Sequence, residues 1–235
     1  MRRRGLFSGI LALAAAALLT GATRPKEAGP KEKDWSATVT ISQEGYHVRG
    51  NPHAPIRLVE YASYSCPHCG IFEMQGAEEL TERFIKPGSV AYEIRPFFLN
   101  EIDKTVSLIA YCGKPEKFFG NTTQLLKYQH EWLRSPTRAQ VQRWSDPDWN
   151  KRVQAMAEDL GLYAMMEKRG YKRSEIDKCL ADEALVAELQ KGTENAFYKE
   201  GVKGTPAFQL NGQLLPVNTW PAIREVLASA MKGFV

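Results

Sequence analysis

The sequence lacks the motifs of several large enzyme classes. It contains no GxSxG motif, no HExxH motif and no phosphate-binding P-loop, and it shows no internal repeat. The first two motifs supply a serine nucleophile and a zinc site, and the third binds nucleotide phosphates. Their absence removes the usual sequence support for a serine hydrolase, a zinc peptidase or a nucleotide-binding enzyme.

An excess of charge of one sign is also missing. The chain has 31 Lys and Arg against 27 Asp and Glu, a formal net charge of +4. Three of the basic residues are Arg2, Arg3 and Arg4, so residues 23–235 hold 28 basic and 27 acidic residues, a net charge of +1. This balance gives no support for a nucleic-acid partner.

The first 22 residues are predicted to be a signal peptide. A basic stretch at 2–4 precedes an uncharged apolar run from Leu6 to Leu19, and Thr20-Gly21-Ala22 offers small residues for cleavage. The apolar run is short for a bilayer span, which needs about 20 residues. An uncleaved anchor is therefore the less favoured alternative. The polar stretch that follows predicts a linker and an N-terminal edge segment over 23–50.

Cysteine is scarce, with four residues in the mature chain: Cys66, Cys69, Cys112 and Cys179. Export implies an oxidising compartment, where an even number of cysteines favours two disulfides. Three pairings are possible, and we favour Cys66–Cys69 with Cys112–Cys179. A zinc site needs four ligands at regular spacing. Because Cys112 and Cys179 are single and far apart, we predict no metal site.

The close cysteine pair lies where a strand leads into a helix. Residues 56–61 form an apolar run typical of a buried strand, and apolar residues recur at helical spacing from Ile71 to Phe84. Pro67 suits the first helical turn, where a backbone N–H has no helical partner. Cys66 then lies near the N-cap, at the positive end of the helix dipole, where a reactive thiolate is stabilised. The pattern predicts thiol chemistry.

The order of elements predicts an α/β protein with the thioredoxin fold. We expect a short hairpin over 35–49, strands over 56–61 and 90–98, helices over 104–198, a hairpin over 207–215 and a helix over 220–231. A helix between two strands gives a parallel pair, and Asn211-Gly212 is a strong hairpin turn. A helical domain, 104–198, is thus inserted between the β-α-β and β-β-α halves of a domain formed by 51–103 and 199–235.

The chain resembles the DsbA family of exported thiol-disulfide oxidoreductases. The matching segments are Val59-Glu60-Tyr61, Cys66-Pro67-His68-Cys69 with Phe72-Glu73, and the run 201–208 that contains Thr205-Pro206. The resemblance implies that Cys66 attacks, that Cys69 resolves and that Pro206 follows a cis bond opposite them. The extra cysteines, Cys112 and Cys179, are similar to a second pair in the alpha-proteobacterial-like subgroup, where they imply a structural disulfide; a second redox pair is the alternative.

Five further residues are candidates for tuning or binding. The His68 imidazole can stabilise the Cys66 thiolate, and Pro67 shapes the same turn. Glu60, near the end of a buried strand, is expected to have a raised pKa and to exchange a proton with Cys69. Glu73 is either a second tuning carboxylate or a solvated charge on the helix. Thr205 can pair its backbone with an extended substrate.

The resemblance implies a monomeric periplasmic enzyme that forms disulfide bonds in reduced exported proteins. It implies no bound cofactor and a membrane quinone-linked partner that reoxidises the cysteine pair. Two alternatives are open: a disulfide isomerase or reductase of the same fold, and a thioredoxin-fold peptide-binding chaperone whose cysteine pair is structural.

Overall fold

The computed structural model describes residues 33–233. The predicted signal peptide, residues 1–22, lies outside the described residues, as does most of the linker. Among residues 33–233, no helix combines the length and apolar character needed to cross a membrane.

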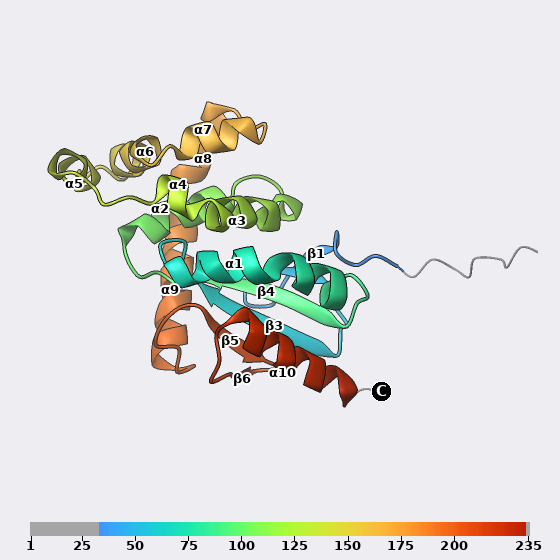
Figure 1. Ribbon diagram of the computed structural model, residues 1–235. Helices are drawn as coiled ribbons and strands as arrows, with labels where there is room; N and C mark the ends of the chain where they lie inside the picture. The colour runs from blue at the N-terminus through green and yellow to red at the C-terminus, as the bar shows by residue number, and fades with distance from the viewer. Residues whose placement is uncertain (1–32, 234–235) are drawn as a thin grey trace, which may run out of the picture. The chain divides into compact units, whose positions relative to one another are not determined.

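A six-stranded mixed sheet forms the centre of the fold (Figure 1), with strand order β1-β2-β4-β3-β5-β6. Only β3 and β4 pair in parallel; the other neighbours are antiparallel. The strands are β1 (Val39–Ile41), β2 (His47–Gly50), β3 (Ile56–Ala62), β4 (Val90–Pro96), β5 (Ala207–Leu210) and β6 (Gln213–Leu214). Both predicted hairpins are present, and the predicted thioredoxin fold with a helical insertion is confirmed.

One face of the sheet is covered by α1 (Pro67–Leu80) and α10 (Trp220–Lys232), which lie side by side. The Phe72 ring of α1 packs against Phe208 of β5 at 4.6 Å and against Trp220 of α10 at 5.9 Å between ring centroids. Gly76 allows this approach, because a Cβ there would lie 2.6 Å from the Trp220 ring. A π-helical turn, η1 (Thr81–Ile85), extends α1 before the chain enters β4.

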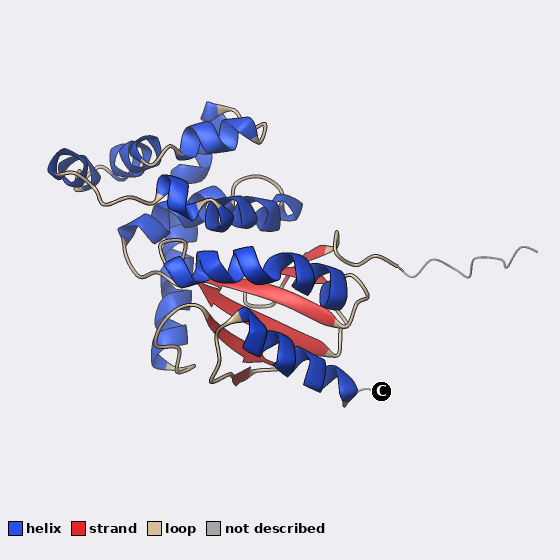
Figure 2. Ribbon diagram, viewed as in Figure 1, coloured by secondary structure: helices blue, strands red, loops and turns tan. Residues whose placement is uncertain are grey.

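Most of the helical block between β4 and β5 lies beyond α1, on the side of α1 away from the sheet (Figure 2). Its first helix begins at Glu101, ahead of the predicted start at 104, because Asn100 caps it by accepting the Ile102 N–H at 2.9 Å. The helices are α2 (Glu101–Ala110), the short η2 (Pro115–Lys117), α3 (Phe118–Lys127), α4 (Gln129–Trp132), α5 (Arg138–Trp144), α6 (Trp149–Asp159), α7 (Leu162–Lys168), α8 (Arg173–Leu180) and α9 (Glu183–Tyr198).

Alternate side chains of β3 point to opposite faces of the sheet and belong to two different hydrophobic clusters. Leu58 and Ala62 belong to the large core shared with α1, whereas Val59 and Tyr61 belong to a smaller cluster with Ala196 of α9. Helix α9 therefore packs against the sheet face opposite α1. The domain boundaries stay predictions.

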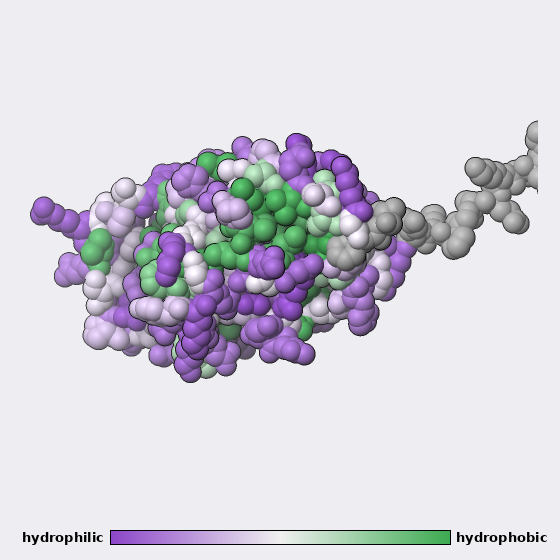
Figure 3. All heavy atoms as spheres, turned by 90° about the horizontal axis from the view of Figure 1, so that it is seen from below, coloured by the Kyte–Doolittle hydropathy of each residue, from purple (hydrophilic) through white to green (hydrophobic). Residues whose placement is uncertain are grey.

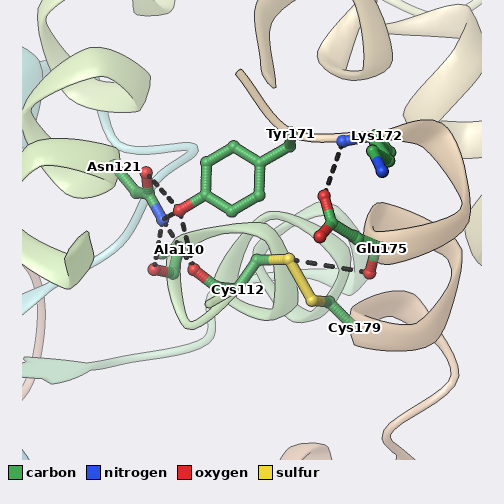
Figure 4. Close-up of a disulfide and its surroundings, with 7 residues drawn as sticks. All are labelled: Ala110, Cys112, Asn121, Tyr171, Lys172, Glu175 and Cys179. Atoms are coloured by element: carbon green, nitrogen blue, oxygen red, sulfur yellow. Dashed lines mark hydrogen bonds between the residues drawn. A yellow bond between two sulfur atoms is a disulfide. The ribbon is translucent and has the colours of Figure 1, made fainter. Parts of the chain in front are cut away.

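A disulfide joins Cys112, just after α2, to Cys179 of α8, with an S–S distance of 2.06 Å (Figure 4). Polar contacts hold the same end of α2. The Tyr171 hydroxyl donates to the Cys112 carbonyl at 2.9 Å, and Asn121 Nδ2 donates to the carbonyls of Ala110 at 3.2 Å and Cys112 at 3.0 Å. Of the favoured pairing, the structure contains the Cys112–Cys179 bridge, whereas Cys66 and Cys69 are free thiols.

We expect this disulfide to stabilise the protein. It closes a loop with a sequence separation of 67 residues. In the chain-entropy model, such a loop contributes about 4 kcal/mol. The test is urea unfolding of the Cys66→Ser/Cys69→Ser variant with and without reductant, so that reductant acts on one disulfide alone. The same comparison in a variant that also carries Cys112→Ala and Cys179→Ala is the control. An unfolding midpoint that reductant leaves unchanged in the first variant contradicts the prediction.

Candidate active site

Cys66 is the N-cap residue of α1. Its backbone is extended, with φ −85° and ψ 117°, and its carbonyl accepts the N–H of Cys69 at 3.1 Å and of Gly70 at 3.4 Å. The first turn of α1 holds no acidic residue. An anion at this position therefore faces unpaired N–H groups and the positive end of the helix dipole.

Cys66 is buried, with 6% of the residue exposed, and its sulfur lies against the loop before β5. Its thiol donates to the Thr205 carbonyl at 3.2 Å, and the Thr205–Pro206 bond is cis. A hydrogen bond with the Cys69 thiol is the largest cause that lowers the pKa of Cys66. Burial opposes it, and bonds with the side chain of Thr205 and with the backbone N–H groups of Cys69 and His68 bring this pKa to about 5, from an ordinary 9.0.

Cys69 lies in the opposite environment. It is fully buried, and burial raises the pKa of its thiol well above the ordinary value, with the charges of Glu60 and Cys66 acting in the same direction. Both cysteines are free thiols in this structure. The two sulfurs therefore differ in acidity: Cys66 is the stable thiolate and Cys69 the stable thiol at neutral pH.

Glu60 lies in β3, beneath α1, and is 1% exposed. Burial raises its pKa from 4.5 to about 8, although the Tyr92 hydroxyl donates to its Oε2. Its Oε1 has no hydrogen-bond partner among the described residues. At neutral pH this carboxyl group holds a proton and keeps one oxygen unpaired.

Glu73 is buried, at 7% exposed, so the solvated-charge alternative is wrong. Burial raises its pKa, against the effects of Thr123, Arg49 and Lys127. It lines a cavity of about 270 Å³ together with Arg49 and Lys127. The face of α1 that carries it is turned toward α3 and not toward water, which the sequence of α1 alone does not reveal.

Pro67 and His68 are exposed at the start of α1. The backbone N–H of His68 is directed to the Cys66 sulfur and helps to lower the pKa of that thiol. The structure thus brings together Cys66, Cys69, Pro67, His68, Thr205 and Pro206 at one end of the sheet, with Glu60 and Glu73 beneath. Cys112 and Cys179 lie apart, in the helical block.

Sequence reasoning missed residues that hold this site. Tyr92 could have been found from strand periodicity. In the pairing of β3 with β4 it lies opposite Leu58, and Leu58 and Glu60 are on the same face of β3 because side chains alternate between faces. Asp103 and Gln129 have no comparable signal in the sequence. Both contact the turn before Cys66 from helices that follow much later in the chain.

A groove of about 300 Å³ lies beside the Thr205–Pro206 bond, whose Thr205 carbonyl contacts Cys66. The cis bond and the β5–β6 hairpin line it, through Thr205, Pro206, Leu214, Leu215 and Val217. Figure 3, which views the molecule from the side of β6 and α10, shows apolar side chains gathered in the middle of this face. An extended apolar segment fits such a surface.

Within residues 33–233, no group of three or more His, Cys, Asp or Glu side chains is placed to hold a metal ion.

Comparisons with known proteins agree with this geometry. A family model described as thioredoxin matches residues 42–228. The structure of a protein-disulfide isomerase from Novosphingobium aromaticivorans is 39% identical, with a TM-score of 0.74, and the match covers 79% of this chain and 97% of that one. Alpha-DsbA1 of Wolbachia pipientis, 18% identical with a TM-score of 0.66 over 83% of this chain and 97% of that one, shares the fold.

Curated relatives point to the same family. A predicted protein-disulfide oxidoreductase of Rickettsia bellii is 27% identical over 83% of this chain and 68% of its own length. For the Rickettsia prowazekii relative, the match has 25% identity and covers 70% of this chain and 54% of that protein, so the chain spans about half of it. With its cysteine pair at the start of α1 and a fold shared with DsbA proteins, the chain belongs to the thioredoxin family, among the protein-disulfide oxidoreductases.

Proposed function

We propose that the protein is a periplasmic disulfide oxidase that introduces disulfide bonds into reduced exported proteins. The observation that carries this proposal is the placement of the two sulfurs, with Cys66 at the N-cap of α1 and Cys69 fully buried. Because the pKa of Cys66 is lowered to about 5, its thiolate is a good leaving group, and the reduced pair is stabilised relative to the disulfide. A protein with this property is an oxidant. The predicted signal peptide supports the periplasmic location.

The oxidised protein reacts through its Cys66–Cys69 disulfide. A client thiolate attacks Cys66 Sγ, the bond to Cys69 breaks, and Cys69 leaves with the electron pair and takes up a proton. A second client thiolate then attacks the client sulfur of the mixed disulfide and releases Cys66 as a thiolate. The client loses two protons and two electrons. Cys69 keeps one proton, the other enters solvent, and the electrons stay on the two cysteines.

Glu60 is the proton donor and acceptor for Cys69 in this scheme. Its carboxyl is protonated below a pKa of about 8, has one oxygen without a partner, and is coupled by charge to the Cys69 sulfur. The leaving Cys69 thiolate is a strong base, since burial raises the pKa of its thiol. A neighbouring carboxylic acid is therefore the natural source of its proton.

The client binds in the groove beside the cis bond. An extended client segment pairs with the backbone of Thr205 by β-augmentation, and its apolar side chains lie against Leu214, Leu215 and Val217. This places a client cysteine next to Cys66, since the Cys66 sulfur is 3.2 Å from the Thr205 carbonyl. No bound cofactor takes part. A membrane quinone-linked partner reoxidises the monomeric enzyme.

A second candidate is a disulfide isomerase or reductase, which the name of the Novosphingobium aromaticivorans relative favours. The two candidates differ in the potential of the cysteine pair. The test is equilibration with mixtures of reduced and oxidised glutathione. An oxidase gives a potential nearer to about −120 mV than to the about −270 mV of thioredoxin. A potential near the thioredoxin value supports the reductase.

A Cys66→Ser variant with full activity supports instead a chaperone with a structural cysteine pair.

His68→Ala is expected to make the protein a weaker oxidant. Loss of the imidazole removes a group that stabilises the adjacent thiolate, so the pKa of the Cys66 thiol rises. A rise of about one unit is about a tenfold shift in the glutathione equilibrium constant. His53→Ala, which changes an exposed histidine elsewhere, is the matched control. An unchanged potential in the His68→Ala variant rules out this role.

Glu60→Gln is expected to change how stability depends on pH. The folded pKa of Glu60, about 8, lies above its unfolded value of 4.5, so its contribution is complete below pH 4.5 and is lost as pH rises toward 8. The wild type therefore loses stability relative to the variant across this range, about 1.4 kcal/mol for each unit of raised pKa. Urea unfolding of the oxidised proteins, in which Cys66 does not titrate, measures the difference. Parallel pH profiles for the two proteins would show that Glu60 titrates normally.

A further inference from the structure

The turn between β3 and α1 carries no catalytic group, yet it is among the most enclosed parts of the chain. Ser63 is fully buried and Tyr64 is 1% exposed. The Cys66 N–H donates to the Ser63 carbonyl at 3.3 Å, so the turn ends at the reactive cysteine. The position of Ser63, Tyr64 and Ser65 therefore decides where Cys66 enters the helix.

One buried carboxylate binds this turn from the helical block. Asp103, in the first turn of α2, is fully buried. Its Oδ1 accepts the Ser65 N–H at 2.8 Å, its Oδ2 accepts the Ser65 hydroxyl at 3.0 Å, and the Ser63 hydroxyl lies 2.9 Å from both oxygens. The Leu99 N–H adds a fourth donor group at 2.8 Å. Three of the four donors to Asp103 belong to the turn.

Helix α2 does not need this carboxylate as a cap. Asn100 already caps it through the Ile102 N–H, and Asn100 Nδ2 donates to the Ser65 hydroxyl at 2.8 Å. A buried charge costs several kcal/mol unless hydrogen bonds satisfy it, and a packing role is met more cheaply by an apolar residue. The bonds of Asp103 are thus directed at the turn and not at its own helix.

The other side of the turn is held as well. Gln129 Nε2, from α4, donates to the carbonyls of Tyr64 at 2.6 Å and Cys66 at 3.0 Å. The Tyr64 hydroxyl lies 3.0 Å from Thr122 Oγ1 of α3. The turn is therefore fixed between α2 on one side and α3 and α4 on the other, and Asp103 is its charged contact.

We propose that Asp103 is a positioning residue for thiol exchange, which acts by holding the turn of Ser63, Tyr64 and Ser65 so that Cys66 stays at the N-terminus of α1 and against Thr205. This inference rests on the proposed function, since it concerns the same cysteine. It gives the inserted helical block a part in the chemistry: α2 carries the group that sets the place of the reactive sulfur.

The sign of one measurement separates positioning from a simple charge effect. A negative charge near Cys66 raises the pKa of its thiol, so if Asp103 acted through charge alone, Asp103→Asn would lower that pKa. If Asp103 positions the turn, the asparagine presents an amide N–H₂ to the Leu99 N–H and the turn loosens. Cys66 then loses its hydrogen bonds, and the pKa of its thiol rises.

The experiment measures the pH dependence of thiolate absorbance and of alkylation by iodoacetamide in the reduced full-length protein. Asp103→Asn is expected to raise the pKa of the Cys66 thiol by about one unit, about a tenfold loss of thiolate below the midpoint. Glu101→Gln is the control, because Glu101 lies in the same helical turn, is exposed and pairs with Lys104. It leaves the pKa unchanged.

Ser65→Ala tests the same contact if Asp103→Asn does not fold. It removes one hydroxyl from a half-buried residue and is expected to shift the pKa of the Cys66 thiol upward by a smaller amount. Combined with Asp103→Asn, its effect is less than additive, because both changes remove one interaction. Lower stability in these variants with the pKa unchanged or lowered overturns the inference. A wild-type Cys66 with ordinary acidity defeats the proposed function instead.

Discussion

The chemistry proposed for this protein depends on the stabilisation of a sulfur anion, the Cys66 thiolate, at the amino end of α1. Cys66 and Cys69 are one helical turn apart, yet the pKa of the first is lowered to about 5 and that of the second is raised well above its ordinary value. The cause is geometric. The N-cap faces unpaired N–H groups, whereas the next turn is packed into the core beside Glu60. In the mixed disulfide between Cys66 and a client, Cys66 is therefore a good leaving group, because it is released as a stable thiolate.

Each part of the fold contributes to that geometry. Strand β3 ends directly before the cysteine turn, and β5, paired antiparallel with β3, brings the cis bond of Thr205–Pro206 to face it. The helical block holds the turn itself, through Asp103 and Gln129. The disulfide between Cys112 and Cys179 closes the far end of α2, the helix whose first turn carries Asp103. The insertion is thus continuous with the site and is not an appendage.

Local sequence patterns predict the fold and the reactive pair well. The apolar strand, Pro67 in the first helical turn and the Asn211-Gly212 hairpin are local signals, and each predicts the element that is found. Asp103 has no such signal, because its partner Ser65 is 38 residues away and an acidic residue early in a helix is ordinary. Glu73 is similar: its burial depends on α3 packing over α1, which the sequence of α1 does not encode.

The relatives place the chain among protein-disulfide oxidoreductases, whereas the acidity of one thiol decides between oxidase and reductase. The most direct measurement is a pH titration of thiolate absorbance in the reduced protein, with alkylation to assign the transition to Cys66. The account predicts a midpoint near pH 5, well separated from the titration of Cys69. A single transition near pH 9, the ordinary value for a cysteine thiol, would contradict it.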